Sequence, residues 1–213
     1  MRKAVLISIQ PPHIENICTL IEKINGKPIY KKSIEVRKTA PQLSLPFTCY
    51  IYATKSKRYL LDQASDGSLF WWDKKSHHYP FKDEKNFEEL YNGKVIGEFV
   101  CDRIRKIPID LRTARGLLKD ACLSAKELED YRSYKEAYGW HISDLKIYDK
   151  PKELGEFKFP CQRGYNDINN AWCYRERGAR LTMCKYNDMK NNCCNAYLTR
   201  PPQSWCYVEA ANG

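Results

Sequence analysis

The sequence predicts an α+β fold, a mixed β-barrel of five to six short strands with short flanking helices and a Cys-rich insert. Short apolar runs of strand length recur along the chain between turn signals, whereas helical spacing is confined to a few segments. The chain also holds 15 Tyr, 5 Trp and 7 Phe, and aromatic side chains favour strands. A barrel leaves few exposed strand edges.

The N-terminal segment is predicted to form a strand and then a helix. Ala4–Ile9 is a continuous apolar run that stops at Pro11. His13–Ile24 places apolar side chains at helical spacing, and Asn25-Gly26 supplies a typical helix end. We therefore expect one amphipathic helix over His13–Ile24.

Two further strands are predicted before residue 55. Ser33–Lys38 alternates, with Ile34 and Val36 on one face and polar residues on the other, which is typical of a half-buried strand. Phe47–Thr54 is rich in aromatic and β-branched residues, which favour a strand.

The rest of the chain is predicted to complete a single domain over residues 1–213. Residues 55–92 form an excursion that ends at the turn signal Asn92-Gly93, and residues 159–198 form the Cys-rich insert. Ser124 and Glu127 match a capping box. The remaining predicted elements are strands at Lys94–Cys101, His141–Tyr148 and Gln203–Glu209, and a helix at Ser124–Tyr131.

The net charge of +10 is concentrated near the N-terminus. Residues 1–60 hold eleven Lys/Arg and three Asp/Glu, a balance of +8, while residues 61–158 are nearly neutral. Such a balance suits a phosphate-binding surface, although a solvated basic face would show it too. No apolar run reaches the ~18 residues of a membrane span, and we expect a cytoplasmic protein with reduced cysteines.

Several ordered segments resemble the ASCH domain of the PUA-like superfamily, whose hallmark is Gly-x-Lys-x-x-Glu-x-Arg. The resemblance covers most of residues 1–160 and 198–209, and it is nearest to the form carried by bacteriophages and some anaerobic bacteria. It rests on the opening strand Leu6–Pro11, on Lys32–Arg37, and on Asn92–Phe99, Trp140–Ile142, Tyr148–Leu154 and Pro201–Val208.

The match departs from the hallmark in one place. Five extra residues separate Asn25-Gly26 from Lys32, and Tyr30 stands where the family has glycine. Either Lys27 or Lys32 can therefore take the position of the family's lysine, and the spacing to Glu35 favours Lys32.

The resemblance implies a module that binds RNA or a nucleotide in a basic cleft. Arg37 offers a planar fork for phosphate or a base edge, and Lys32 offers a mobile cation. Ser8 and Gln10 are expected beside the same cleft unless they cap the helix, and Trp205 and Tyr207 are expected to stack on a base unless they pack in the core. The predicted binding residues are Ser8, Gln10, Lys32, Glu35, Arg37, Lys38, Trp205 and Tyr207.

Relatives of this fold include a nucleoside amidohydrolase and a ribonuclease, so a hydrolase acting on a modified nucleoside or RNA is the alternative. Lys32 and Glu35 would then be the catalytic residues. The amidohydrolase has threonine three residues after its lysine, and here that position is Glu35, so the nucleophile of that chemistry is missing. An ion pair without a ligand, or an interaction protein that has lost the pocket, is the remaining interpretation.

Five cysteines lie within the Cys-rich insert, and they suggest a structural zinc site. Their spacing includes no Cys-x-x-Cys pair, so a disulfide-linked or reduced insert stays open as well. Apart from this zinc, no cofactor is expected. The candidate zinc ligands are Cys161, Cys173, Cys184, Cys193 and Cys194.

Overall fold

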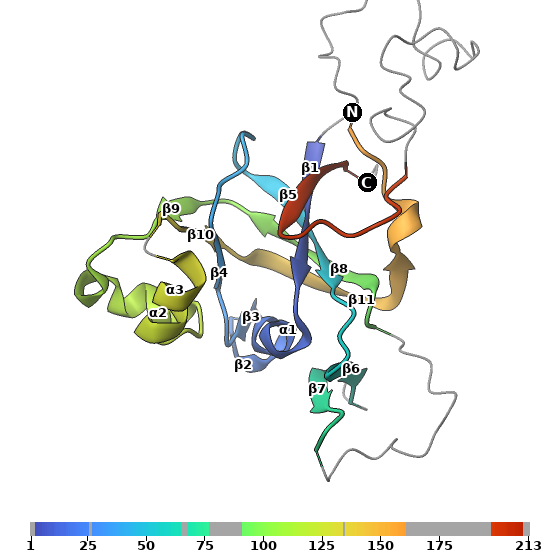
Figure 1. Ribbon diagram of the computed structural model, residues 1–213, viewed down its shortest axis with the longest axis horizontal. Helices are drawn as coiled ribbons and strands as arrows, with labels where there is room; N and C mark the ends of the chain where they lie inside the picture. The colour runs from blue at the N-terminus through green and yellow to red at the C-terminus, as the bar shows by residue number, and fades with distance from the viewer. Residues whose placement is uncertain are drawn as a thin grey trace, which may run out of the picture.

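The computed structural model describes residues 3–25, 27–64, 68–76, 91–133, 135–160 and 197–210. Its centre is a five-stranded sheet in the order β11-β8-β5-β1-β12 (Figure 1). β1 is parallel to β5, and the other neighbours in this sheet are antiparallel. The strands are β1 (Lys3–Ile9), β5 (Phe47–Ala53), β8 (Lys94–Cys101), β11 (Ser143–Glu153) and β12 (Trp205–Glu209).

A second, three-stranded antiparallel sheet has the order β4-β10-β9. Two hairpins, β2-β3 and β6-β7, stand apart from both sheets. The strands of these smaller units are β2 (Leu20–Ile24), β3 (Lys27–Tyr30), β4 (Ile34–Arg37), β6 (Tyr59–Gln63), β7 (Leu69–Asp73), β9 (Ile104–Lys106) and β10 (Tyr138–His141).

The helices are short and lie at the margins of the sheets. α1 (Pro11–Cys18) follows β1 directly, while α2 (Arg115–Asp120) and α3 (Ala125–Arg132) lie together beside β4 (Figure 1). Two 3-10 turns cover Leu111–Ala114 and Leu154–Glu156. In the described part of the chain, no helix has the length and hydropathy that crossing a membrane would require.

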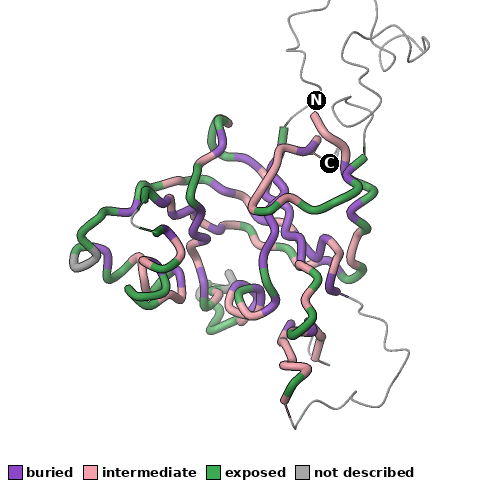
Figure 2. Tube along the Cα trace, viewed as in Figure 1, coloured by how far each residue is buried: buried purple, intermediate pink, exposed green. Residues whose placement is uncertain are grey.

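Three apolar clusters hold these layers together. The largest lies between β1, β5, β8 and α1, and includes Ile7, Ile14, Ile51 and Phe99. A smaller cluster joins β4 to α2 and α3 through Val36 and Leu128, both at least 94% buried. Figure 2 shows the buried backbone running through the centre of the sheets while the helices expose their outer sides.

The structure confirms a mixed α+β fold but differs from the predicted barrel. Within the described residues, β11 and β12 form the two edges of the large sheet, so the pairing does not close. The strands predicted over Ala4–Ile9, Phe47–Thr54 and Lys94–Cys101 are present to within a residue. The capping box of Ser124 and Glu127 is formed at the start of α3.

The helix predicted over His13–Ile24 is wrong in its second half. Both the amide and the hydroxyl of Thr19 bond to the carbonyl of Glu15, and the extended backbone of Thr19 ends α1 at Cys18. The chain then forms the β2-β3 hairpin, where Ile21 is 60% exposed. The apolar residues that are spaced as in one helix therefore belong to two elements, α1 and the β2-β3 hairpin.

The strand predicted over His141–Tyr148 is divided between two sheets. β10 ends at His141 and β11 begins at Ser143, and the backbone amide of Ile142 donates to the carbonyl of Ser33 between them. β11 then continues past Tyr148, where the predicted strand ends, as far as Glu153. The sequence pattern shows extended backbone here but not the change of sheet.

Candidate functional site

Three charged side chains meet at the start of β4. Oε2 of Glu35 lies 2.6 Å from Nζ of Lys32, and Oε1 of Glu35 lies 2.9 Å from Nη2 of Arg37. All three residues are buried, with exposures of 3% for Lys32, 5% for Glu35 and 6% for Arg37. We call Lys32, Glu35 and Arg37 the ion triad. One carboxylate is thus shared by two cations, and the triad keeps one net positive charge.

The backbone around β4 explains why these side chains are buried. The amide of Lys32 donates to the carbonyl of Asn16 in α1, and the amide of Ser33 donates to the carbonyl of Asp120, the last residue of α2. β4 is therefore held between α1 on one side and α2 on the other. Its Ile34 and Val36 pack on the α2-α3 cluster, so the opposite face, with Glu35 and Arg37, turns toward the main core.

Arg37 connects the triad to the first strand. Its Nη2 also donates to the backbone carbonyl of Ser8 at 3.1 Å. The Nε of Arg37 is buried and has no hydrogen-bond partner in the described structure, and the same is true of Nε1 of Trp140. Trp140 lies across from Glu35 in the β4-β10 ladder. Two donors near the triad are therefore left for a group that the protein itself does not supply.

The triad keeps Glu35 ionised. Burial alone would raise the pKa of this carboxyl, but the charges of Lys32 and Arg37 and the hydrogen bond from Lys32 outweigh it and lower the pKa below its ordinary value. Removing one partner of such a buried arrangement typically costs about 3–5 kcal/mol. The ion triad is therefore stable only as a unit.

Two residues that the sequence did not point to also lie beside the triad. His13, in the first turn of α1, is exposed on its outer side, and desolvation and then the charge of Lys32 lower its pKa. Burial raises the pKa of Tyr131 in α3, which also interacts with Arg37. Nζ of Lys38 lies 5.2 Å from the centre of the Tyr131 ring, which brings this predicted residue close to the triad.

Ser8 contacts the triad through its backbone carbonyl, whereas Gln10 lies two residues further on, at the start of α1. The hydroxyl of Ser8 donates to the carbonyl of Pro202 at 2.7 Å, and its amide donates to the carbonyl of Ser204. Gln10 is the exposed N-cap residue of α1, and its backbone carbonyl, not its side chain, accepts from His13 and Ile14. Ser8 thus joins the C-terminal segment to β1 and offers Arg37 its carbonyl.

Trp205 and Tyr207 pack against the main core. Trp205 donates from Nε1 to the hydroxyl of Thr39 at 3.0 Å, and the hydroxyl of Tyr207 accepts from the amide of Gln42 at 2.7 Å. Their ring centres lie 5.3 Å apart, and Trp205 lies 5.9 Å from Trp140. The pair therefore connects the segment after β4 to β12, and Trp205 contacts Trp140, which lies opposite Glu35.

The predicted zinc ligands, Cys161, Cys173, Cys184, Cys193 and Cys194, all lie outside the described residues. Five other cysteines are described, and they are free thiols; burial raises the pKa of Cys206 to about 11 and that of Cys18 to about 12. In the part of the chain that the structure describes, no three His, Cys, Asp or Glu side chains gather as metal ligands do. The zinc site stays a prediction.

No family model and no curated protein matches the chain. Among solved structures, the crystal structure of ASCH from Zymomonas mobilis is similar with a TM-score of 0.43 and 19% identity, covering 71% of this chain and 73% of that one. Two of its point mutants give TM-scores of 0.43 and 0.42 with 19% and 21% identity. Likeness of this extent does not establish a family.

Proposed function

We propose that this protein is an RNA- or nucleotide-binding module of the ASCH type and that a phosphate group binds beside the ion triad. The observation that carries the proposal is the uncompensated positive charge of Lys32, Glu35 and Arg37 in a buried setting. A buried charge is costly unless an opposite charge or hydrogen bonds satisfy it. An anion next to Arg37 would supply both.

Phosphate fits the groups that are available. A guanidinium binds phosphate through a planar fork, and the Nε of Arg37 is still without a partner in the described structure. The side chain of Lys38 is exposed beside Tyr131, and Lys31 is exposed at the other end of β4. These lysines would bind further phosphates of the same strand, in keeping with the +8 balance of residues 1–60.

Hydrolysis has less support than binding. A general base works best when its pKa lies near the operating pH, but the pKa of Glu35 is lowered and both of its oxygens face cations. Glu35 is therefore suited to holding Arg37 and Lys32 in place. We expect RNA that has been bound to this protein to be recovered intact.

The test is a salt titration of binding to short single-stranded RNA, with wild type and Arg37→Lys in parallel. Arg37→Lys keeps the charge but loses the fork, so binding should weaken while the fold is retained, as circular dichroism would show. Lys3→Ala, at the exposed start of β1, serves as the control for an unrelated surface charge. Equal binding by Arg37→Lys and wild type would reduce the triad to a structural role, and cleaved RNA would bring the hydrolase forward.

A further inference from the structure

The β6-β7 hairpin carries three adjacent aromatic residues on one strand. Leu61 and Leu69 belong to the main core together with Ile14 and Ile17 of α1, so one face of the hairpin packs on that helix. Phe70 and Trp72 alternate to the opposite face and are partly exposed. Their ring centres lie 5.4 Å apart, and Nε1 of Trp72 donates to Asp62 at 3.2 Å. This face of the hairpin therefore carries two partly exposed aromatic rings beside Leu60, which is fully buried.

Basic residues gather at the open end of the same hairpin. Antiparallel pairing sets Tyr59 opposite Asp73, and the amide of Lys74 donates to the carbonyl of Arg58, so the residues before β6 lie beside those after β7. Residues 55–64 and 68–76 hold five Lys/Arg and two Asp/Glu, a balance of +3. The basic residues are Lys55, Lys57, Arg58, Lys74 and Lys75.

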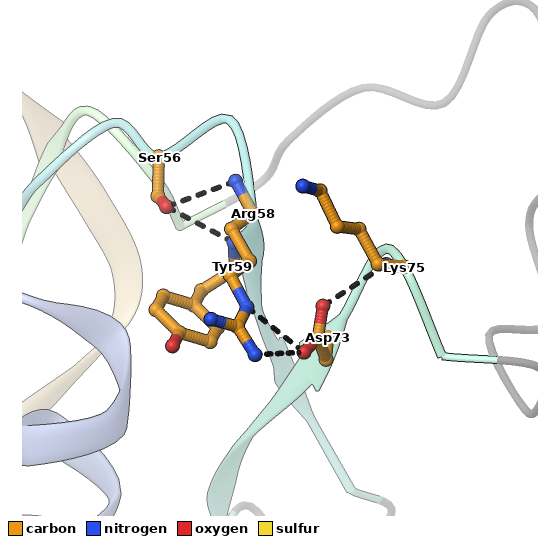
Figure 3. Close-up of polar contacts among 5 residues, drawn as sticks. All are labelled: Ser56, Arg58, Tyr59, Asp73 and Lys75. Atoms are coloured by element: carbon orange, nitrogen blue, oxygen red, sulfur yellow. Dashed lines mark hydrogen bonds and ion pairs between the residues drawn. The ribbon is translucent and has the colours of Figure 1, made fainter.

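One of these cations is held rigidly, and others extend into solvent. Arg58 donates from Nε and Nη2 to the carboxylate of Asp73 at 2.9 and 2.8 Å, and its guanidinium lies over the Tyr59 ring (Figure 3). Lys57 precedes this arginine in the chain, Lys75 follows its partner Asp73 by two residues, and both lysines are exposed. The open end of the hairpin thus presents exposed positive charge beside the ion pair of Arg58 and Asp73.

The hairpin is also firmly attached to the domain. Asn92, which is 97% buried, accepts from the amide of Leu61 and donates to the carbonyls of Thr54 and Tyr59. The hairpin rests on α1, whose first turn carries His13 next to the ion triad. A strand held at the triad would meet the hairpin on the other side of this helix.

We propose that the β6-β7 hairpin is a second contact surface for single-stranded RNA, which extends the site at the ion triad. Phe70 and Trp72 would stack on bases, and Lys57 and Lys75 would contact the phosphates between them. Flat aromatic faces combined with backbone-tracking cations are how proteins hold single strands without reading their sequence. This inference rests on the proposed function, and it makes the ligand an oligonucleotide rather than a free nucleotide.

The experiment compares oligouridines of about 4 and about 16 nucleotides, which bracket common single-strand site sizes. The hairpin variants are Lys57→Ala/Lys75→Ala, which removes charge, and Phe70→Leu, which removes the flat ring but keeps apolar volume. The matched control is Lys3→Ala/Lys135→Ala, an equal change of charge at exposed positions at the start of β1 and just after α3, away from the hairpin (Figure 1). Circular dichroism checks that each variant is folded.

Wild type should bind the longer oligouridine more tightly than the shorter one. The double lysine variant should lose this gain, and the slope of its log affinity against log salt should fall by about 1.4, from about 0.7 for each phosphate contact on a single strand. Phe70→Leu should weaken binding of the longer oligouridine about 5- to 150-fold and leave the salt slope unchanged. The control should behave as wild type.

Failure of this inference can be told apart from failure of the proposed function. If the longer oligouridine gains nothing over the shorter one, or both hairpin variants match the control, the hairpin is not a binding surface, while binding that depends on Arg37 still stands. If wild type binds neither oligouridine, the site at the ion triad is wrong and this extension is wrong with it.

Discussion

Trp140 lies directly opposite Glu35 in the antiparallel β4-β10 ladder, and paired residues of this kind share one face of a sheet. The indole is fully buried and packs edge-on against Phe47 at 6.1 Å and beside Trp205 at 5.9 Å. Glu35 is thus covered by an apolar wall on its own face. These apolar side chains shield Glu35 from water on this face of the sheet.

The first prediction concerns the charge of Glu35. Glu35→Gln should lower the free energy of unfolding by about 3–5 kcal/mol, because Lys32 and Arg37 would stay buried without their shared anion. Urea unfolding measures the change. The matched control is Glu136→Gln, which removes an exposed ion pair with Lys106 and should leave stability unchanged. A Glu35→Gln protein as stable as wild type would show that the triad does not hold β4.

The second prediction is a loss of stability on acidification in two stages. The pKa of His13 is lowered from 6.5 in the folded state, so the unfolded chain binds a proton first and stability falls as the pH drops below about 6.5. The pKa of Glu35 is lowered from 4.5, so its contribution is lost as the pH falls from about 4.5 through the folded pKa.

The two stages can be separated by mutation. In His13→Gln, the stage that begins near pH 6.5 should become shallower while the stage below pH 4.5 remains. The measurement is the urea midpoint at a series of pH values between 7 and the acid limit of folding. If the urea midpoints of wild type and His13→Gln depend on pH in the same way, the pKa of His13 is not lowered in the folded protein.

The third prediction uses two glycines with opposite surroundings. A Cβ at Gly97 in β8 would lie 2.5 Å from the carbonyl oxygen of Lys146, so Gly97→Ala should force β8 and β11 apart and lower the melting temperature clearly. A Cβ at Gly116 in α2 meets nothing within 4 Å, and Gly116→Ala should stabilise by up to about 1 kcal/mol through helix propensity. Thermal unfolding checks both, and a tolerated Gly97→Ala would contradict the close pairing of β8 and β11.

Local patterns in the sequence predicted the strands at Ala4–Ile9 and Lys94–Cys101, which are rich in apolar and β-branched residues and bounded by turn signals, and the capping box of Ser124. They could not locate the end of α1, because Thr19 closes the helix through bonds to Glu15 that the apolar spacing does not reveal. Nor could they predict the pairing of β1 with both β5 and β12, which joins residues far apart in the chain.

The sequence predicted that the three residues of the ion triad lie together, but not which side chains surround them. The spacing from Lys32 to Glu35 and Arg37 suggested one cluster, and the structure brings the three together. The alternation of polar and apolar residues predicted that one face of β4 is exposed to solvent. In the structure, separate apolar clusters cover both faces of β4. His13 and Tyr131 were missed because their approach to the triad depends on how α1 and α3 pack, for which the sequence holds no local signal.

The most direct test of the central claim compares a nucleoside with its phosphate. Uridine 5′-monophosphate should raise the melting temperature of wild type, and uridine should not, because the phosphate is the group that pairs with the positive charge of the triad. The Arg37→Lys variant should lose most of this rise in melting temperature, because lysine lacks the planar fork. Equal shifts with uridine and its monophosphate, or an unchanged shift in Arg37→Lys, would contradict a phosphate site beside Arg37.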